Sequence, residues 1–356
     1  MAPDLGSVCH LLRTDGSPES YELDGELLIQ AAAGEDAESL CAAVALAFTS
    51  NITLASLSLR SNGLGAAAAE ALATALRTNM RLCSLELGSN RLGPGGASAL
   101  AAALRRNETL DTLGLANNGL TGEGDDVSID ASGVVALAAA LRVNRGLTSL
   151  DMAGNCLTDY GENDAALAAL LEAANGNPRL QRLDLGCNDL GTRGAELLRA
   201  ALLRNGSLTE LCLRDNHLRP PGAHAVAAVL RGNGALRRLD VSGNDLTDSG
   251  GDESGFVAMA RSLEANSTLW VLDAGRNALG VGGATALARP LTRIGSHLTR
   301  LYKLKILKMY DNFWKKRANF METLKTIDAL CLRFNGHSAP ICAQTGWRTR
   351  CGATPR

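Results

Sequence analysis

The chain of 356 residues has few aromatic residues, no lysine before Lys303 and no long apolar run. Aromatic residues make up 3% of the chain and hydrophobic residues 46%, so we expect a core of leucine and alanine rather than aromatic rings. No stretch of 18 apolar residues is free of charge, which argues against a membrane-spanning helix. The formal net charge of −2 excludes a binder of polyanions that is basic throughout.

The residue types that usually carry catalysis or bind metal show no useful pattern. The five histidines are scattered, and the nine cysteines contain no Cys-x-x-Cys pair. We therefore predict a non-enzyme with no catalytic residue, no metal site and no cofactor. The first fifteen residues lack the basic and apolar segments of a secretory signal. We expect reduced thiols and a cytoplasmic location, with a nuclear or cytoskeleton-associated one as the alternative.

A leucine pattern recurs through most of the chain. The spacing L-x-x-L-x-L-x-x-N-x-L runs from Leu54 to Leu64 and returns eight more times, the last copy ending at Trp314. The closing asparagines lie 28, 28, 37, 33, 28, 28, 33 and 35 residues apart. Four intervals equal 28 and the others look like 28 plus an insertion, which indicates a repeat protein.

Each repeat combines two periodicities. The Leu-x-Leu core alternates as in a strand, whereas Ala69, Leu72, Ala73 and Leu76 recur at i, i+3, i+4 and i+7, as on one face of a helix. We therefore predict an α/β fold, a curved solenoid or horseshoe with parallel strands on the concave side and helices on the convex side.

An asparagine closes every copy of the pattern. Its side chain can bond main-chain groups in the turn that leaves the strand, where no sheet partner exists. We assign this structural role to nine residues: Asn62, Asn90, Asn118, Asn155, Asn188, Asn216, Asn244, Asn277 and Asn312. Other asparagines form N-x-S/T sequences, which we interpret as turns rather than glycosylation sites. These are Asn51, Asn107, Asn205 and Asn266.

The repeat boundaries predict four segments. Residues 1–50 form an N-terminal cap, with a helix over Asp36–Phe48 and a degenerate strand near Leu27–Ile29. Residues 51–314 form the solenoid of about nine repeats. Residues 315–336 form a C-terminal cap with a degenerate repeat, and we expect residues 337–356 to be disordered.

The 28-residue unit, with its alanine-rich helix motif from Gly95 to Asn107, resembles the ribonuclease-inhibitor class of leucine-rich repeats. That class includes the inhibitor itself, the repeat regions of NOD-like receptors and Ran GTPase-activating protein. The resemblance covers roughly three quarters of the chain and implies a protein-binding horseshoe. Two features depart from these relatives. With no lysine ahead of Lys303, the P-loop of a NOD-like receptor is missing, and the segment after the repeats is basic where that of Ran GTPase-activating protein is acidic.

The residue between the two leucines of each strand is predicted to be exposed on the concave face. It is acidic in five of the nine repeats: Glu86, Asp151, Asp184, Asp240 and Asp273. Neighbouring strands lie about 4.8 Å apart, so we expect carboxylates side by side. Either this stripe binds a basic partner, or aspartate is simply common here and arginines such as Arg214 partly neutralise it. We include Arg214 and Trp270 in the predicted binding face, Trp270 as an anchor.

Three insertions are acidic and glycine-rich, at residues 122–130, 159–164 and 248–253. Each follows a closing asparagine and precedes a helix, so we expect all three to line one rim. They are either solvated loops or an acidic surface for a basic partner. None has the ligand spacing of an EF-hand loop.

The last 62 residues differ in charge from the rest. Residues 295–356 carry a net charge of +9, against −11 for residues 1–294, and contain seven of the twelve aromatic residues. We favour a cap that closes the end of the core. The alternative is a basic surface at Lys315, Lys316 and Arg317 for nucleic acid, an acidic filament or anionic lipid.

These observations predict a scaffold that binds a protein partner through the concave face and the acidic rim. Two alternatives stay open: a regulator of a small GTPase resembling Ran GTPase-activating protein, and a cytoskeletal or ciliary component anchored through the basic segment.

Overall fold

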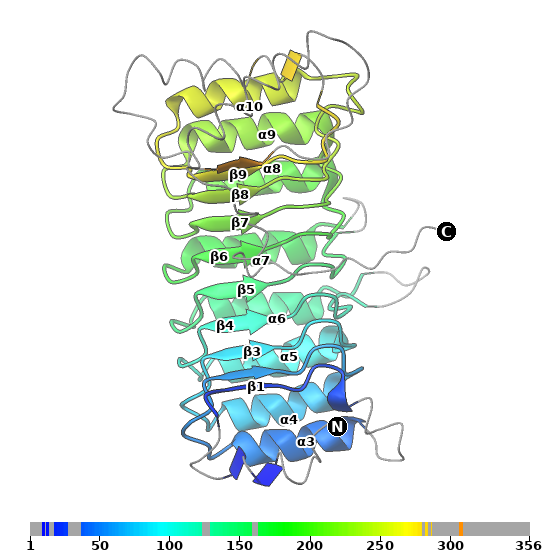
Figure 1. Ribbon diagram of the computed structural model, residues 1–356, viewed down its shortest axis with the longest axis vertical. Helices are drawn as coiled ribbons and strands as arrows, with labels where there is room; N and C mark the ends of the chain where they lie inside the picture. Colours follow the sequence, from blue (N-terminus) through cyan, green and yellow to red (C-terminus); the bar gives the residue numbers. More distant parts are fainter. Residues whose placement is uncertain are drawn as a thin grey trace. The chain divides into compact units, whose positions relative to one another are not determined.

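The computed structural model describes residues 18–27, 37–122, 129–158 and 163–279, together with shorter stretches at 9–10, 12–13, 282–283, 286 and 306–308. The predicted C-terminal cap and tail, with Asn312, Lys315, Lys316 and Arg317, lie outside these residues. The chain divides into two compact units, Met1–Asn188 and Asp189–Arg356. In each unit, the strands form one layer and the helices form a second layer behind it (Figure 1).

In the first unit, each strand pairs in parallel with the next strand along the chain. Its described strands are β1 (Ser20–Glu22), β2 (Ser56–Ser58), β3 (Ser84–Glu86), β4 (Thr112–Gly114), β5 (Ser149–Asp151) and β6 (Arg182–Asp184). Its described helices are α3 (Ala37–Phe48), α4 (Ala66–Leu76), α5 (Gly93–Leu104), α6 (Ser132–Leu141) and α7 (Ala165–Gly176).

The second unit repeats the same arrangement. Its described strands are β7 (Glu210–Cys212), β8 (Arg238–Asp240), β9 (Val271–Asp273) and β10 (Ile306–Lys308), paired in parallel in that order. Its described helices are α8 (Gly191–Leu202), α9 (Arg219–Gly232) and α10 (Ser254–Ala265). Parallel strands joined through helices confirm the predicted α/β repeat fold.

Leucine and alanine build the core, as the lack of aromatic residues predicts. The central residue of every strand from β2 to β9 is a buried leucine. On the helices, the buried positions follow the predicted spacing, for example Ala69, Leu72, Ala73 and Leu76 of α4. Burying these side chains is the main favourable contribution to folding, because each transfers apolar surface out of water.

Two glycines let helices lie unusually close together. A Cβ at Gly133 of α6 would lie 2.4 Å from the carbonyl oxygen of Pro94 in α5. A Cβ at Gly255 of α10 would lie 2.5 Å from the carbonyl oxygen of Pro220 in α9. Both distances are shorter than van der Waals contact, so only glycine fits without moving the neighbouring helix.

The N-terminal cap differs in part from its prediction. The helix expected over Asp36–Phe48 is α3, but the first strand is β1 at Ser20–Glu22 rather than near Leu27–Ile29. β1 pairs with β2, whereas the backbone N–H of Leu27 donates to Asn62 Oδ1 at 2.9 Å. Leu27 thus lies beyond the strand and the turn at residues 24–25, in helical conformation. The prediction failed because Ser20–Glu22 lacks the Leu-x-Leu pattern used to find strands.

The cysteines also depart in part from expectation. Cys9, Cys41, Cys83, Cys156 and Cys212 form no disulfide. Cys187, however, is disulfide-bonded, so the thiols are not all reduced as the sequence led us to expect.

Candidate functional site: the strand face

In each unit, the surface opposite the helices is the candidate binding surface, and we call it the strand face. It comprises the first and third residues of each strand, the residue that precedes each strand and the two residues before each closing asparagine. The first residues of β2 to β5 are serine or threonine, all half-buried and in register: Ser56, Ser84, Thr112 and Ser149. Most of the charged and aromatic side chains of the face fall into two groups. One group is the third residues of the strands, and the other is the remaining strand-face residues of the second unit.

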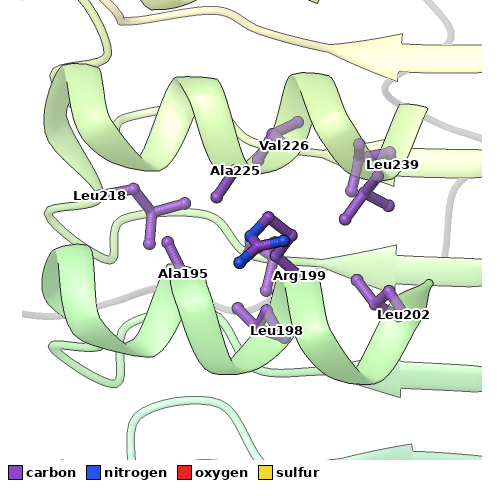
Figure 2. A pocket seen from close by; sticks show the side chains of 10 residues that line it. Ala195, Leu198, Arg199, Leu202, Leu218, Ala225, Val226 and Leu239 are labelled. Carbon is purple, nitrogen blue, oxygen red and sulfur yellow. The ribbon is translucent and has the colours of Figure 1, made fainter. Parts of the chain in front are cut away.

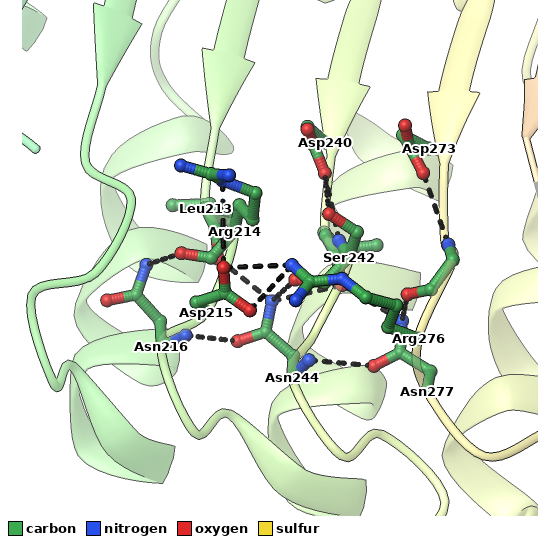
Figure 3. Close-up of polar contacts among 12 residues, drawn as sticks. Leu213, Arg214, Asp215, Asn216, Asp240, Ser242, Asn244, Asp273, Arg276 and Asn277 are labelled. Atoms are coloured by element: carbon green, nitrogen blue, oxygen red, sulfur yellow. Dashed lines mark hydrogen bonds and ion pairs between the residues drawn. The ribbon is translucent and has the colours of Figure 1, made fainter. Parts of the chain in front are cut away.

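The closing asparagines lie beneath the strand face and hold successive repeats together. Asn244 is fully buried, and its Nδ2 donates to the carbonyls of Leu213, Val241 and Ser242 at 2.8 to 3.1 Å. Its Oδ1 accepts the N–H of Asn216 at 2.9 Å, while its own N–H donates to Oδ1 of Asn277 (Figure 3). The same link joins Asn62 to Asn90, Asn118 to Asn155 and Asn155 to Asn188. These asparagines therefore satisfy main-chain groups that have no partner in the sheet.

The asparagines before the strands form a second set of links. Nδ2 of Asn107 donates to the carbonyl of Leu76 in the preceding repeat at 2.7 Å, and Oδ1 accepts the N–H of Leu110 at 2.8 Å. Asn107 belongs to an N-x-S/T sequence, as do Asn51 and Asn205, and all three are buried. An amide nitrogen that is buried and bonded inside the fold is closed to glycosylation, which supports the turn interpretation.

The acidic stripe is less exposed than predicted. Asp184 and Asp273 are buried, with 3% and 6% of their surface accessible, whereas Glu86, Asp151 and Asp240 are half-buried. The predicted neighbours are in register, Asp151 with Asp184 and Asp240 with Asp273.

Each aspartate at the third position of a strand bonds the backbone two residues further on. Asp184 accepts the N–H of Gly186 at 2.8 Å, and Asp273 accepts that of Gly275 at 3.2 Å. Asp240 accepts both the N–H and the hydroxyl of Ser242, as Figure 3 shows. Aspartate therefore recurs here in part because a short carboxylate can cap the end of the strand. Sequence reasoning missed this local role, for which the only signal was the repeated aspartate.

Glu86 is held in an ion pair. Arg60 of the preceding repeat bonds its carboxylate, and this carboxylate lies over Gly114, where a Cβ would be 2.0 Å from Oε2. Burial lowers the pKa of Arg60, but the charge and hydrogen bond of Glu86 outweigh that effect and raise the pKa above its usual value. Glu86 is therefore partly neutralised, unlike an isolated acidic contact.

A second ion pair crosses a whole repeat. Nη2 of Arg276 lies 2.8 Å from both carboxylate oxygens of Asp215, and the repeat between them contributes Gly243 (Figure 3). A Cβ at Gly243 would lie 1.9 Å from Asp215 Oδ1, and Gly243 has φ +66°. Arg214, predicted as a binding residue, is half-buried with its Nε 3.7 Å from Asp215. In the sequence, the only indication of the Asp215–Arg276 ion pair was the glycine at the turn position between them.

Trp270, the predicted anchor, is half-buried at the start of β9. The guanidinium carbon of Arg237 lies 5.1 Å from the centre of its ring. Arg237 and Trp270 occupy the same position in adjacent repeats, one residue before β8 and β9. Beside them, Nε of Arg238 lies 3.6 Å from Glu210.

Of the three acidic insertions, only the one at 248–253 is fully described. Its backbone closes on itself, with the N–H of Asp252 donating to the carbonyl of Thr247 at 2.9 Å. Hydrogen bonds from the hydroxyl and the N–H of Ser254 lower the pKa of Asp252. Within the described residues, no cluster of three or more His, Cys, Asp or Glu side chains is arranged to hold a metal ion.

A small cleft lies on the helix side of the second unit, between α8 and α9 (Figure 2). Its walls are aliphatic except for Arg199. They comprise Ala195, Leu198, Arg199, Leu202, Leu213, Leu218, Ala225, Val226, Val229 and Leu239. The cleft has no converging polar groups to orient a ligand, so we treat it as a packing feature.

None of the described helices combines the length and the apolar character that crossing a bilayer requires.

Comparison with protein-family models identifies part of the repeats. A family model described as "Leucine Rich repeat" matches residues 50–73, 78–101, 143–161, 176–198 and 235–253. No sequence among the curated proteins matches the chain.

Solved structures share the fold. The leucine-rich repeat-containing protein LegL7 from Legionella pneumophila is similar with a TM-score of 0.55 and 17% identity, covering 92% of this chain and 93% of that one. At this identity the likeness concerns the fold alone. The tropomodulin C-terminal domain of Caenorhabditis elegans (15% identity) and the actin-binding site 2 of leiomodin-1 (19% identity) each cover 49% of this chain, with TM-scores of 0.39 and 0.37. They cover 93% and 91% of their own chains.

Proposed function

Because the chain contains leucine-rich repeats, we propose that it is a non-enzymatic scaffold that binds a protein partner through its strand face. Leucine-rich-repeat folds commonly serve as protein-interaction modules, but the fold alone names no partner. The choice of surface therefore depends on the side chains of the face.

One observation carries the choice of the strand face. In the second unit it combines a half-buried carboxylate, an aromatic ring and arginines, at Asp240, Trp270, Arg214 and Arg237, and in the first unit it presents the half-buried carboxylate of Asp151. Aromatic residues and arginine are the types most enriched among residues that dominate binding energy. Since backbone bonds fix the aspartates, the face is ordered before a partner arrives, which lowers the entropy lost on binding.

We propose that the acidic members attract basic residues of the partner. Asp151 and Asp240 are accessible enough to act, whereas buried Asp184 and Asp273 contribute to the negative potential without direct contact. Charge complementarity of this kind mainly raises the association rate.

The double variant Asp151→Asn, Asp240→Asn tests the proposal. Asparagine keeps the oxygen that accepts the N–H of Ala153 or Ser242, so the charge is removed while the cap stays. We expect binding to a purified partner, first recovered by crosslinking to the full chain, to weaken about twofold to tenfold and to become less sensitive to salt.

Glu70→Gln, at an exposed position of helix α4 outside the strand face and the acidic insertions, is the matched control and should bind as wild type. Unchanged affinity and salt dependence in the double variant would show that the acidic members of the strand face do not attract the partner. The recovered partner also separates the alternatives, because a small GTPase would favour regulation and a filament protein would favour a cytoskeletal role. We propose that the chain acts in the cytoplasm, and fractionation of cells checks this.

A further inference from the structure

Among the described side chains of the strand face in the second unit, the guanidinium of Arg237 is the most available cation. The side chain is exposed, and its guanidinium carbon lies 5.1 Å from the Trp270 ring centre. The other three strand-face arginines of that unit have carboxylate neighbours: Arg214 and Arg276 with Asp215, and Arg238 with Glu210. Among the described residues, no carboxylate lies within ion-pair distance of Arg237, and no side-chain hydrogen bond involves it.

The backbone fixes this pair in place. The N–H groups of both Trp270 and Val271 donate to the carbonyl of Arg237, at 2.7 and 3.0 Å. Because β8 and β9 are in register, Arg237 and Trp270 start adjacent strands and their side chains meet across the sheet. A guanidinium that rests on an indole ring loses conformational freedom, while its N–H donors stay open to another group.

We propose that Arg237 and Trp270 form an anchor for a carboxylate of the protein partner, an aspartate or glutamate side chain with an aliphatic residue beside it. The guanidinium supplies two parallel N–H donors to the carboxylate. The indole of Trp270, with Val271 next to it, supplies an apolar contact for the neighbouring residue. This inference rests on the proposed function and adds an acidic determinant to the basic ones that Asp151 and Asp240 attract.

Charge on the surrounding face selects a single carboxylate over a polyanion. Glu210 and Asp240 belong to the strands beside the anchor, and Asp273 ends the strand that Trp270 precedes. A phosphate backbone running along the sheet would meet these carboxylates, and like charges at close range are repulsive. A single carboxylate bound to Arg237 does not extend along the sheet and so stays away from these acidic side chains.

The test is selection of random peptides displayed on phage against the full chain, with the Arg237→Gln and Trp270→Leu variants in parallel. Arg231→Gln, an exposed arginine in the last turn of α9, is the matched control. Wild type and the control should enrich peptides in which an acidic residue adjoins an aliphatic one.

A selected peptide is then synthesised together with the isostere in which Asn or Gln replaces its acidic residue. We expect Arg237→Gln to weaken its binding on the order of tenfold to a hundredfold, as loss of a charge-assisted hydrogen bond implies, and the isostere to bind wild type as weakly. Trp270→Leu should weaken binding while circular dichroism stays native.

Three results would overturn the anchor: no peptide selected by wild type, equal affinity of Arg237→Gln, or equal affinity of the isostere. Binding of a single-stranded oligonucleotide that depends on Arg237, without selected acidic peptides, would assign the site to nucleic acid instead. The Asp151→Asn, Asp240→Asn experiment is independent, so failure of the anchor is distinguishable from failure of the proposed function.

Discussion

At the scale of the residue, a carboxamide does what no other side chain can do in the closing turn. Asn244 donates to three carbonyls and accepts from the N–H of Asn216 in one buried position. A carboxylate keeps the acceptor but presents a buried charge to those carbonyls. Buried polar groups that lose their partners cost about 1–3 kcal/mol each.

We therefore expect Asn244→Asp to lower the free energy of unfolding by at least about 3 kcal/mol at pH 7, measured by urea denaturation. Asn117→Asp is the control, because Asn117 is half-buried and the corresponding turn position in a later repeat holds Asp215. The control should stay within about 0.5 kcal/mol of wild type. Equal stability of the two variants would contradict the role of the carboxamide donor.

The ion pair over Gly243 gives a second prediction at this scale. Gly243→Ala introduces a Cβ 1.9 Å from Asp215 Oδ1 and forces alanine into a left-handed conformation. We expect a loss of about 1–3 kcal/mol in the free energy of unfolding, from strain and from the displaced Asp215–Arg276 pair. Gly234→Ala, where a Cβ meets nothing within 4 Å, should change stability little. Thermal denaturation of both variants checks the difference.

Single residues also mark where the sequence was informative. The recurrence of asparagine predicted the turn role that its hydrogen bonds display. The recurrence of aspartate was ambiguous, because a strand-capping carboxylate and a binding carboxylate produce the same pattern. In the structure all four aspartates accept a backbone hydrogen bond, and they differ in burial, because Asp184 and Asp273 are buried whereas Asp151 and Asp240 are half-buried. The Arg237–Trp270 pair forms because β8 and β9 are in register although their repeats differ in length. The sequence alone did not predict that these two side chains would be in contact.

At the scale of the element, packing between helices is uneven in the second unit. α9 lies so close to α10 that Gly255 admits no side chain, yet a cleft separates α9 from α8. Ala223 faces the close contact with α10, and Ala225 lines the cleft between α9 and α8. Both are buried alanines of one helix, so helix propensity is equal and only the room around them differs.

Methionine at each position tests this contrast. We expect Ala223→Met to lower the free energy of unfolding by about 1–3 kcal/mol, because the closely packed backbone of α10 cannot yield. Ala225→Met should lower it less than Ala223→Met does, because the cleft relieves part of the crowding around the flexible side chain. Guanidinium chloride titrations of the two variants provide the measurement, and equal losses would contradict uneven packing.

Elements with the full leucine pattern were predicted well, and those without it were not. β2 to β9 all fall on the Leu-x-Leu cores. β1 was misplaced because its three residues are Ser20, Tyr21 and Glu22, and a neighbouring strand rather than its own apolar pattern makes it a strand. Tertiary pairing of this kind leaves little trace in local sequence.

At the scale of the whole molecule, the described cysteines that form no disulfide differ in accessibility. Cys83 and Cys156 are exposed, whereas Cys41 and Cys212 are buried in the first and second unit respectively. Burial, and secondarily the charge of Glu38, raises the pKa of Cys41 from 9.0 to about 12. At pH 8 the Cys41 thiol is therefore protonated as well as shielded, and only the thiolate reacts readily.

We expect a thiol reagent at pH 8 to label Cys83 and Cys156 in the native chain and to reach Cys41 and Cys212 only after denaturation, with peptide mass spectrometry as the readout. The sign of the pH effect follows from the raised pKa. Since the folded chain holds this proton more tightly, the contribution of Cys41 to stability is complete below pH 9 and is lost as pH rises toward about 12. Cys41→Ala should lack that alkaline loss. Rapid native labelling of Cys41 would contradict the described burial.

The links between asparagines also bear on how such a chain can lengthen over evolutionary time. Asn155 and Asn244 each offer an acceptor toward the repeat before and an N–H toward the repeat after, across intervals of 28, 33 and 37 residues. A gene segment that encodes one repeat thus carries both halves of the joint. Tandem duplication inserts a copy that fits its neighbours on either side, and the loops are free to vary in length because the joint does not pass through them.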